Sequence, residues 1–83
     1  MKILFFARLR QAAGRSEMDA DIPAHVKTVS ALIDFLKAGD DGLAHAFADP
    51  RIIRAAVDRK HVALDASIEG AEEIAFFPPV TGG

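Results

Sequence analysis

The sequence predicts an α+β domain in which one amphipathic helix covers one face of a mixed β-sheet. Two segments typical of strands precede a single clear helical stretch, and three more follow it. The 83 residues are enough for one hydrophobic core and too few for two. We therefore expect one domain over residues 1–77, followed by an extended tail over residues 78–83.

The composition excludes several classes of function. Hydrophobic residues make up 51% of the chain and charged residues 27%, which is typical of a globular domain. The chain contains no Cys, which excludes disulfides, thiol nucleophiles and Cys-ligated metals. Its net charge of −2 gives no basic surface for nucleic acid. No apolar run approaches the roughly 20 residues of a membrane span, so we expect a cytoplasmic protein without a membrane partner.

The first two strands are predicted from their hydrophobic patterns. Lys2–Arg8 is almost continuously apolar, which is typical of a strand buried on both faces. Glu17–Ile22 alternates between polar and apolar residues, as in a half-buried strand, and Pro23 ends it. Gln11–Arg15 contains a glycine and is interpreted as the turn of a hairpin.

The helix is predicted over Thr28–Ala38. Thr28 is a typical N-cap residue, and Gly39 lies where helices commonly end. The apolar residues of this stretch recur at i, i+3, i+4 and i+7, which forms a single stripe. Asp40 or Asp41 could cap a second, shorter helical turn, which ends before Pro50.

Three further strands are predicted after the helices, at Ile52–Val57, Lys60–Val62 and Glu73–Phe77. Asp58-Arg59 is a weak turn signal between the first two of them. The element order is therefore β-β-α-(short α)-β-β-β. The residues expected to form the core are Ile3, Phe5, Ile22, Leu32, Ile33, Leu36, Val57, Ile74 and Phe76.

The chain lacks the common catalytic motifs for nucleotides, phosphates, zinc and serine nucleophiles. Its three histidines, His25, His45 and His61, fall on separate predicted elements, so we expect no metal site. The neighbouring carboxylates of Asp40-Asp41 and Glu72-Glu73 point apart on a strand and do not face each other on a helix, which argues against acid–base catalysis.

The tail is the feature that a packed core does not explain. Pro78-Pro79 favours a stiff, extended backbone, and the glycines Gly82 and Gly83 present no side chain. A frayed terminus is the ordinary alternative. Six residues reach up to about 20 Å when extended, which suits insertion into a narrow site on another protein.

The C-terminal residues resemble those of a known family. The string Glu73-Ile74-Ala75-Phe76-Phe77-Pro78-Pro79-Val80-Thr81-Gly82-Gly83 is similar to the end of the small subunit of molybdopterin synthase, the MoaD family. The opening Lys2–Arg8, Thr28-Val29 and Ala55-Ala56-Val57 also resemble that family. The family commonly has Asn after Ala-Val, where this chain has Asp58.

This resemblance implies a ubiquitin-like β-grasp fold and a sulfur-carrier role. In the family, an adenylyltransferase related to ubiquitin-activating enzymes uses ATP to activate the terminal glycine, and sulfur transfer then gives a thiocarboxylate. The large synthase subunit takes up the tail and moves the sulfur onto cyclic pyranopterin monophosphate, typically in a heterotetramer. Gly83 would carry the sulfur, and residues Pro78, Pro79, Val80, Thr81 and Gly82 would enter the partner's active site. The chain itself would bind no cofactor and supply no catalytic side chain.

We also expect a docking surface beside the tail. By the alternation of the strands, Phe6 and Phe77 point away from the helix, and His61 borders them. Three alternatives of function stay open. The first is a sulfur carrier of another pathway, such as the thiamine type, and the second is a ubiquitin-like modifier attached to lysines through Gly83. The third is a plain interaction module, whose Gly-Gly end has no role.

Overall fold

The computed structural model describes residues 1–79, which form a five-stranded mixed sheet. The strands are β1 (Lys2–Phe5), β2 (Glu17–Asp19), β3 (Arg54–Val57), β4 (Lys60–Val62) and β5 (Glu73–Phe77), in the spatial order β2-β1-β5-β3-β4. The central pair β1–β5 is parallel and the other pairs are antiparallel. The predicted mixed sheet is therefore confirmed.

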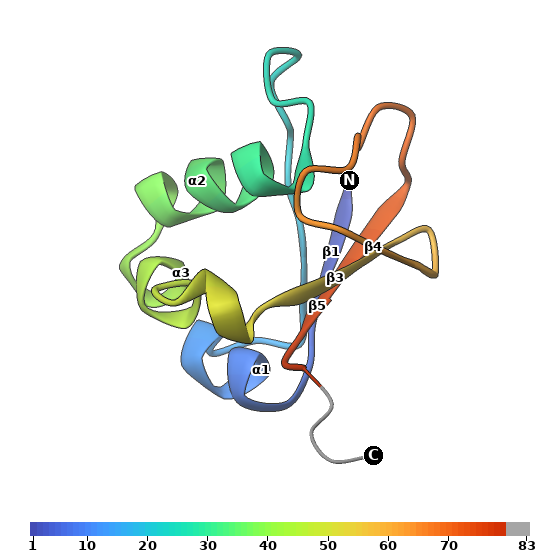
Figure 1. Ribbon diagram of the computed structural model, residues 1–83. Helices are drawn as coiled ribbons and strands as arrows, with labels where there is room; N and C mark the ends of the chain where they lie inside the picture. The colour runs from blue at the N-terminus through green and yellow to red at the C-terminus, as the bar shows by residue number, and fades with distance from the viewer. Residues whose placement is uncertain (80–83) are drawn as a thin grey trace.

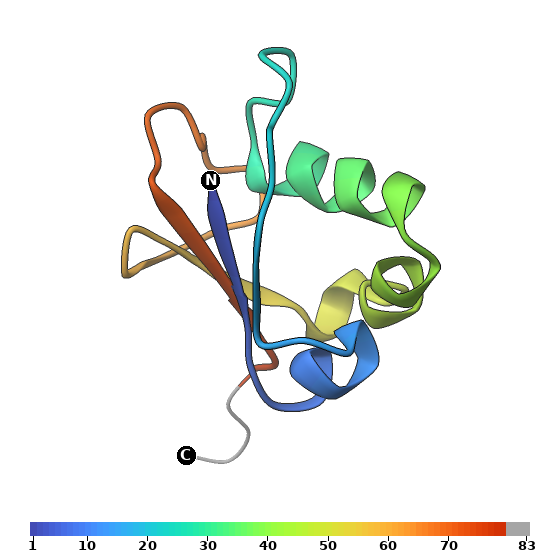
Figure 2. The same cartoon turned by 180° about the vertical axis from the view of Figure 1, so that it is seen from behind.

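The helices gather on one side of this sheet (Figures 1 and 2). The longest is α2 (Val29–Gly39), followed by α3 (Asp41–Ala46) and a 3₁₀ turn at Pro50–Ile52. Helix α1 (Ala7–Ala13) fills the corner where β1 ends and packs against α3. This arrangement is the ubiquitin-like β-grasp, in which no other element of residues 1–79 covers the opposite face of the sheet.

The predicted caps of both later helices are confirmed. The hydroxyl of Thr28 accepts a hydrogen bond from the N–H of Ala31 at 3.1 Å, which satisfies one free donor at the start of α2. Helix α2 runs one residue further than predicted, through Gly39. Asp40 follows it, and its carboxylate accepts the N–H of Leu43 at 3.0 Å, so that α3 begins there.

The prediction of a strand over Lys2–Arg8 is wrong in its second half. Strand β1 ends at Phe5, and α1 occupies Ala7–Ala13, including most of the predicted turn Gln11–Arg15. Ala7 enters the helix with a left-handed φ of 54°, and Gly14 closes it at φ 76°. The buried residues Leu9 and Ala13 are spaced at i and i+4, which is typical of a helix. The continuous apolar run before them favoured a strand, and so this spacing was not used in the prediction.

Two other strands are shorter than predicted. The predicted strand Glu17–Ile22 ends already at Asp19. Its partner β1 begins at Lys2, so the last backbone hydrogen bond between the two segments joins Met1 and Ala20. The predicted Ile52–Val57 strand begins at Arg54. Its first residue belongs instead to the 3₁₀ turn that the carboxylate of Asp49 caps.

The core lies between the sheet and the helices. Seven of the nine predicted core residues are buried, and the other two, Ile22 and Val57, are half-buried against it. The rings of Phe5, Phe47 and Phe76 pack together, with 4.9 Å between the centroids of Phe47 and Phe76. Large buried residues that the predicted list lacked are Leu9, Val26, Val29, Leu43, Phe47, Ile53 and Ile68.

A tight turn joins β3 to β4, as the weak signal at Asp58-Arg59 predicted. Both residues have positive φ, 48° and 72°, which is the geometry of a two-residue type I′ turn. The carboxylate of Asp58 also accepts the N–H groups of Glu72 and Glu73, each at 3.0 Å. The turn is thereby tied to the start of β5.

Within residues 1–79, the helices are all too short or too polar to cross a lipid bilayer.

Candidate functional site

The uncovered face of the sheet carries a continuous apolar row. The ladders place Leu4 opposite Ala75, Ala75 opposite Ala56, and Ala56 opposite His61. Residues directly opposite each other project from the same face, and their neighbours Ile74 and Phe76 project into the core. The row from Leu4 to His61 therefore lies on the face away from the helices.

The two phenylalanines predicted to point outward lie on this same face. Phe6 is still extended, with φ −123° and ψ 153°, so its side chain projects opposite to that of the buried Phe5. Its N–H donates to the carbonyl of Phe76 at 3.0 Å, which fixes it beside the end of β5. Phe77 is half-buried, and its ring centroid lies 5.0 Å from that of His61.

We call this surface the outer-face patch. Its residues are Leu4, Phe6, Ala56, His61, Ala75 and Phe77. The structure places Phe6, His61 and Phe77 together on one face, and their role in binding a partner stays a prediction. Leu4, Ala56 and Ala75 were not predicted as part of a site, although the alternation of their strands already gave the correct face. Phe6 is 49% exposed, an unusual position for a large apolar side chain beside a second apolar ring.

Charged side chains border the patch. Lys2 lies opposite Glu73 in the β1–β5 ladder, and its ammonium group is 3.7 Å from the carboxylate of Glu17. Arg54 lies opposite Phe77 and donates to the backbone carbonyl of Ile53 at 3.0 Å. An apolar centre with a charged rim is the usual anatomy of a protein–protein interface.

The tail begins at a fixed point next to the patch. Strand β5 lies between β1 and β3 and bonds to both, so its end at Phe77 is held on two sides. Pro78 and Pro79 follow it and are half-buried. The predicted tail residues Val80, Thr81, Gly82 and Gly83 lie outside the described residues. The end of β5, from which the tail continues, lies in the middle of the sheet, beside Phe6 and α1 (Figure 1).

The titratable groups give no sign of a second kind of site. In the described part of the chain, no three His, Asp or Glu side chains come close enough to hold a metal ion. The guanidinium of Arg51 bonds the carboxylate of Asp49 at 3.0 Å, which lowers the pKa of Asp49 and raises the pKa of Arg51. This pair is solvent-exposed and belongs to the 3₁₀ turn rather than to the patch.

Comparison with known sequences gives consistent relatives. The sequence model of the ThiS family matches residues 3–83. The molybdopterin synthase sulfur carrier subunit of Escherichia coli is 41% identical, over all of this chain and 99% of that protein. The protein of the same description from Haemophilus influenzae is 32% identical, again over all of this chain and 99% of its own length.

Three solved structures with the same fold are similar to this chain over almost its whole length. The crystal structure of SAMP1 from Haloferax volcanii matches with a TM-score of 0.74 and 28% identity, over all of this chain and 98% of that one. A putative molybdopterin converting factor, subunit 1, from Pyrococcus furiosus matches with a TM-score of 0.73 and 26% identity, over 95% of each chain. A second Haloferax volcanii structure, of small archaeal modifier protein 1, matches with a TM-score of 0.70 and 29% identity, over 96% of this chain and 97% of that one.

Proposed function

Because the chain belongs to the ThiS family and is of the molybdopterin synthase small-subunit type, we propose that it carries sulfur for the biosynthesis of the molybdenum cofactor. The observation that supports this most directly is the position of the tail. A Pro-Pro-Val-Thr-Gly-Gly end follows a strand that is anchored on both sides, directly beside an exposed apolar patch. A carrier needs both features, since its end must reach a partner's site while its body docks.

The chemistry proposed for Gly83 follows from the low reactivity of a carboxylate. Its pKa is about 3.5 in a free chain end, so the group is anionic at neutral pH and a poor electrophile. We expect an adenylyltransferase to let this carboxylate attack the α-phosphorus of ATP, which releases pyrophosphate and leaves an acyl-adenylate. A sulfide-level donor then displaces AMP and gives the thiocarboxylate. After the sulfur moves to cyclic pyranopterin monophosphate, water restores the carboxylate.

The partner is proposed to supply the catalytic side chains. A glycine at each of the last two positions lets the walls of a narrow channel approach the reacting carbon closely. The chain then acts as a tethered co-substrate of the large synthase subunit, and ATP is consumed by the activating enzyme. We propose that this chain binds no cofactor of its own.

The outer-face patch should supply most of the affinity for the large subunit. Ordering six tail residues costs about 6–12 kcal/mol of backbone entropy, and the prolines reduce this cost. Burying one phenylalanine returns about 1.5–3 kcal/mol. A synthetic peptide of residues 78–83 should therefore bind the large subunit far more weakly than the intact chain, as measured by calorimetry. Equal affinities would show that the patch takes no part in docking.

Deletion of Gly83 tests the carrier role itself. The change should leave the melting temperature unaltered, yet it retracts the reacting carbon by up to about 3.5 Å. A misplacement of about 1 Å can already cost about a hundredfold in rate. The assay is dithiolene formation from cyclic pyranopterin monophosphate by the large subunit, with the activating enzyme, ATP and a sulfide source.

A variant with one residue added after Gly83 is a second, independent test. It keeps every native residue but converts the carboxylate of Gly83 into a peptide amide, which cannot be adenylated, and moves the free carboxylate one residue further out. We expect this extended chain to be inactive, although it remains folded. Normal dithiolene formation by either variant would refute the carrier role.

A ubiquitin-like modifier is the second candidate, and the likeness to the small archaeal modifier protein 1 favours keeping it. Both functions begin with adenylation of the terminal glycine, and they differ in the acceptor. Intact mass spectrometry of the chain from its native host separates them. Exchange of one oxygen for sulfur supports the carrier, whereas an isopeptide bond between Gly83 and a lysine supports the modifier.

A further inference from the structure

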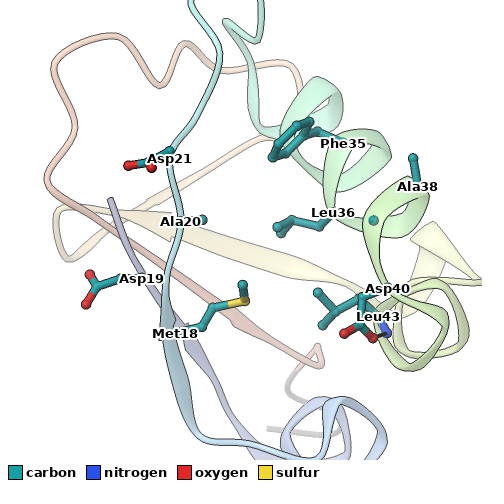
Figure 3. A pocket seen from close by; sticks show the side chains of 10 residues that line it. Met18, Asp19, Ala20, Asp21, Phe35, Leu36, Ala38, Asp40 and Leu43 are labelled. Carbon is teal, nitrogen blue, oxygen red and sulfur yellow. Dashed lines mark hydrogen bonds between the residues drawn. The ribbon is translucent and has the colours of Figure 1, made fainter.

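A groove lies on the helical side of the molecule, along the free edge of β2 (Figure 3). This β2 groove, of about 510 Å³, runs between residues 18–21 and the second half of α2. Met18 and Ala20 point into it from the strand, and Phe35 and Leu36 point into it from the helix. The groove is therefore lined mainly by apolar side chains, and it is distinct from the outer-face patch on the other side of the sheet.

Among the residues that the structure describes, no strand pairs with the outer edge of β2, the strand beside the groove. The N–H of Phe5 donates to the carbonyl of Ser16 at 2.9 Å, and Met1 and Ala20 exchange two hydrogen bonds of 2.9 and 3.0 Å. Backbone groups alternate in direction along an antiparallel strand, so those of Glu17 and Asp19 point away from β1. Since β2 is the last strand of the sheet on this side, these groups are available to an added strand.

The side chains of the edge strand define the chemistry of such an addition. In Figure 3 the carboxylates of Asp19 and Asp21 point away from the groove, to the opposite side of the strand. Within residues 1–79, neither has an ion-pair partner, whereas the carboxylate of Asp40 across the groove already bonds Leu43 and lies 3.3 Å from Arg15. A strand paired with β2 would cover the groove with every second side chain and place the others beside these two aspartates.

We propose that the β2 groove binds an extended segment of a partner protein in which apolar residues alternate with Lys or Arg. The segment pairs with the edge of β2, its apolar side chains enter the groove, and its cations face Asp19 and Asp21. A second copy of this chain fits poorly, because pairing two β2 edges would bring like charges together.

The test is an amide NMR titration of the full-length chain with two matched peptides. One alternates valine with lysine over eight residues, and the other replaces each lysine with glutamate. The lysine peptide should shift the amide signals of Glu17, Asp19 and the inward side of α2, and it should slow hydrogen exchange at the Glu17 and Asp19 amides. The glutamate peptide should bind at least about tenfold more weakly, since each exposed pair changes from attractive to repulsive.

Two variants locate the binding. The double substitution Asp19→Lys with Asp21→Lys should reverse the preference between the peptides, without filling the groove. Gly39→Trp places a large ring at the groove from the end of α2, where an added Cβ meets nothing within 4 Å, and should abolish binding. Ala48→Trp, at an exposed position away from the groove, is the matched control and should bind as the parent does.

Several results would overturn the proposal. The first two are equal binding of both peptides and amide shifts that are confined to the outer-face patch. The third is the absence of any amide shift at millimolar peptide. The fourth is a shift of the β2 amide signals that depends on protein concentration without peptide, which would indicate self-association. The outcome is independent of the carrier role, because the titration does not involve Gly83. A chain without Gly83 should bind the lysine peptide unchanged, even though it fails in dithiolene formation.

Discussion

Replacing Phe6 with alanine should weaken docking to the large synthase subunit and leave the domain intact. A phenylalanine side chain buries about 200 Å² when fully covered, and Phe6 is 49% exposed in the free chain. A partner that covers it removes about another 100 Å² from water, which is worth about 2.5 kcal/mol at 25 cal/mol per Å². The dissociation constant should therefore rise by up to about 60-fold.

The assay is calorimetric titration of the large subunit with each variant, accompanied by thermal unfolding. Because the side chain of Phe6 is exposed and does not pack in the core, Phe6→Ala should shift the melting temperature by no more than a few degrees. Phe35→Ala is the matched control, since Phe35 is a half-buried phenylalanine on the helical side of the molecule. If Phe6→Ala binds as tightly as the parent, or if Phe35→Ala loses as much affinity, the outer-face patch is not the docking surface.

Four further predictions concern the fold. Leu36→Ala should lower the free energy of unfolding by about 2–5 kcal/mol, because this side chain is 4% exposed in the core; an unchanged denaturation midpoint would show that its packing is misassigned. Arg59→Gly should raise the free energy of unfolding by about 1 kcal/mol by relieving the φ of 72° in the type I′ turn; a loss of stability in urea unfolding would mean that the turn is not strained there. Asp58→Asn should retain the acceptor for both β5 amides and cost less than Asp58→Ala in the same measurement. Arg51→Ala should raise the pKa of Asp49 towards its ordinary value of 3.8, as measured by NMR titration. Because the pKa of Asp49 is depressed in the folded state, the ion pair stabilises the fold above pH 3.8, and this contribution disappears as the pH falls through the lowered pKa. An unchanged pKa of Asp49 in the variant would contradict the ion pair.

The sequence was most informative where a pattern had local causes. Thr28 predicted the start of α2 because an N-cap acts within one turn of its own helix. For the same reason, the pair Asp40-Asp41 predicted the start of α3, and the structure shows that Asp40 is the cap. The outward direction of Phe6 and Phe77 followed from strand alternation, a property of the backbone alone.

The wrong predictions concern segments whose secondary structure is decided by contacts with residues far away in the sequence. Residues 2–8 are apolar almost throughout, and this pattern fits a buried strand or the start of a buried helix equally well. The left-handed turn at Ala7 that separates β1 from α1 has no marker in the sequence, since alanine rarely adopts that conformation. Glu17–Ile22 kept its alternation beyond Asp19, yet the strand stops where the partner strand begins at Lys2.

The sequence by itself determined the α+β class, the main helix, part of the core and the proline-glycine tail as the candidate functional end. Only the tertiary structure decided which surfaces remain uncovered. Strand order places β5 in the centre and β2 at the edge, which creates the outer-face patch on one side and the β2 groove on the other. The physical reason is that pairing between β1 and β5 joins residues about 70 positions apart in the chain, beyond the reach of any local pattern.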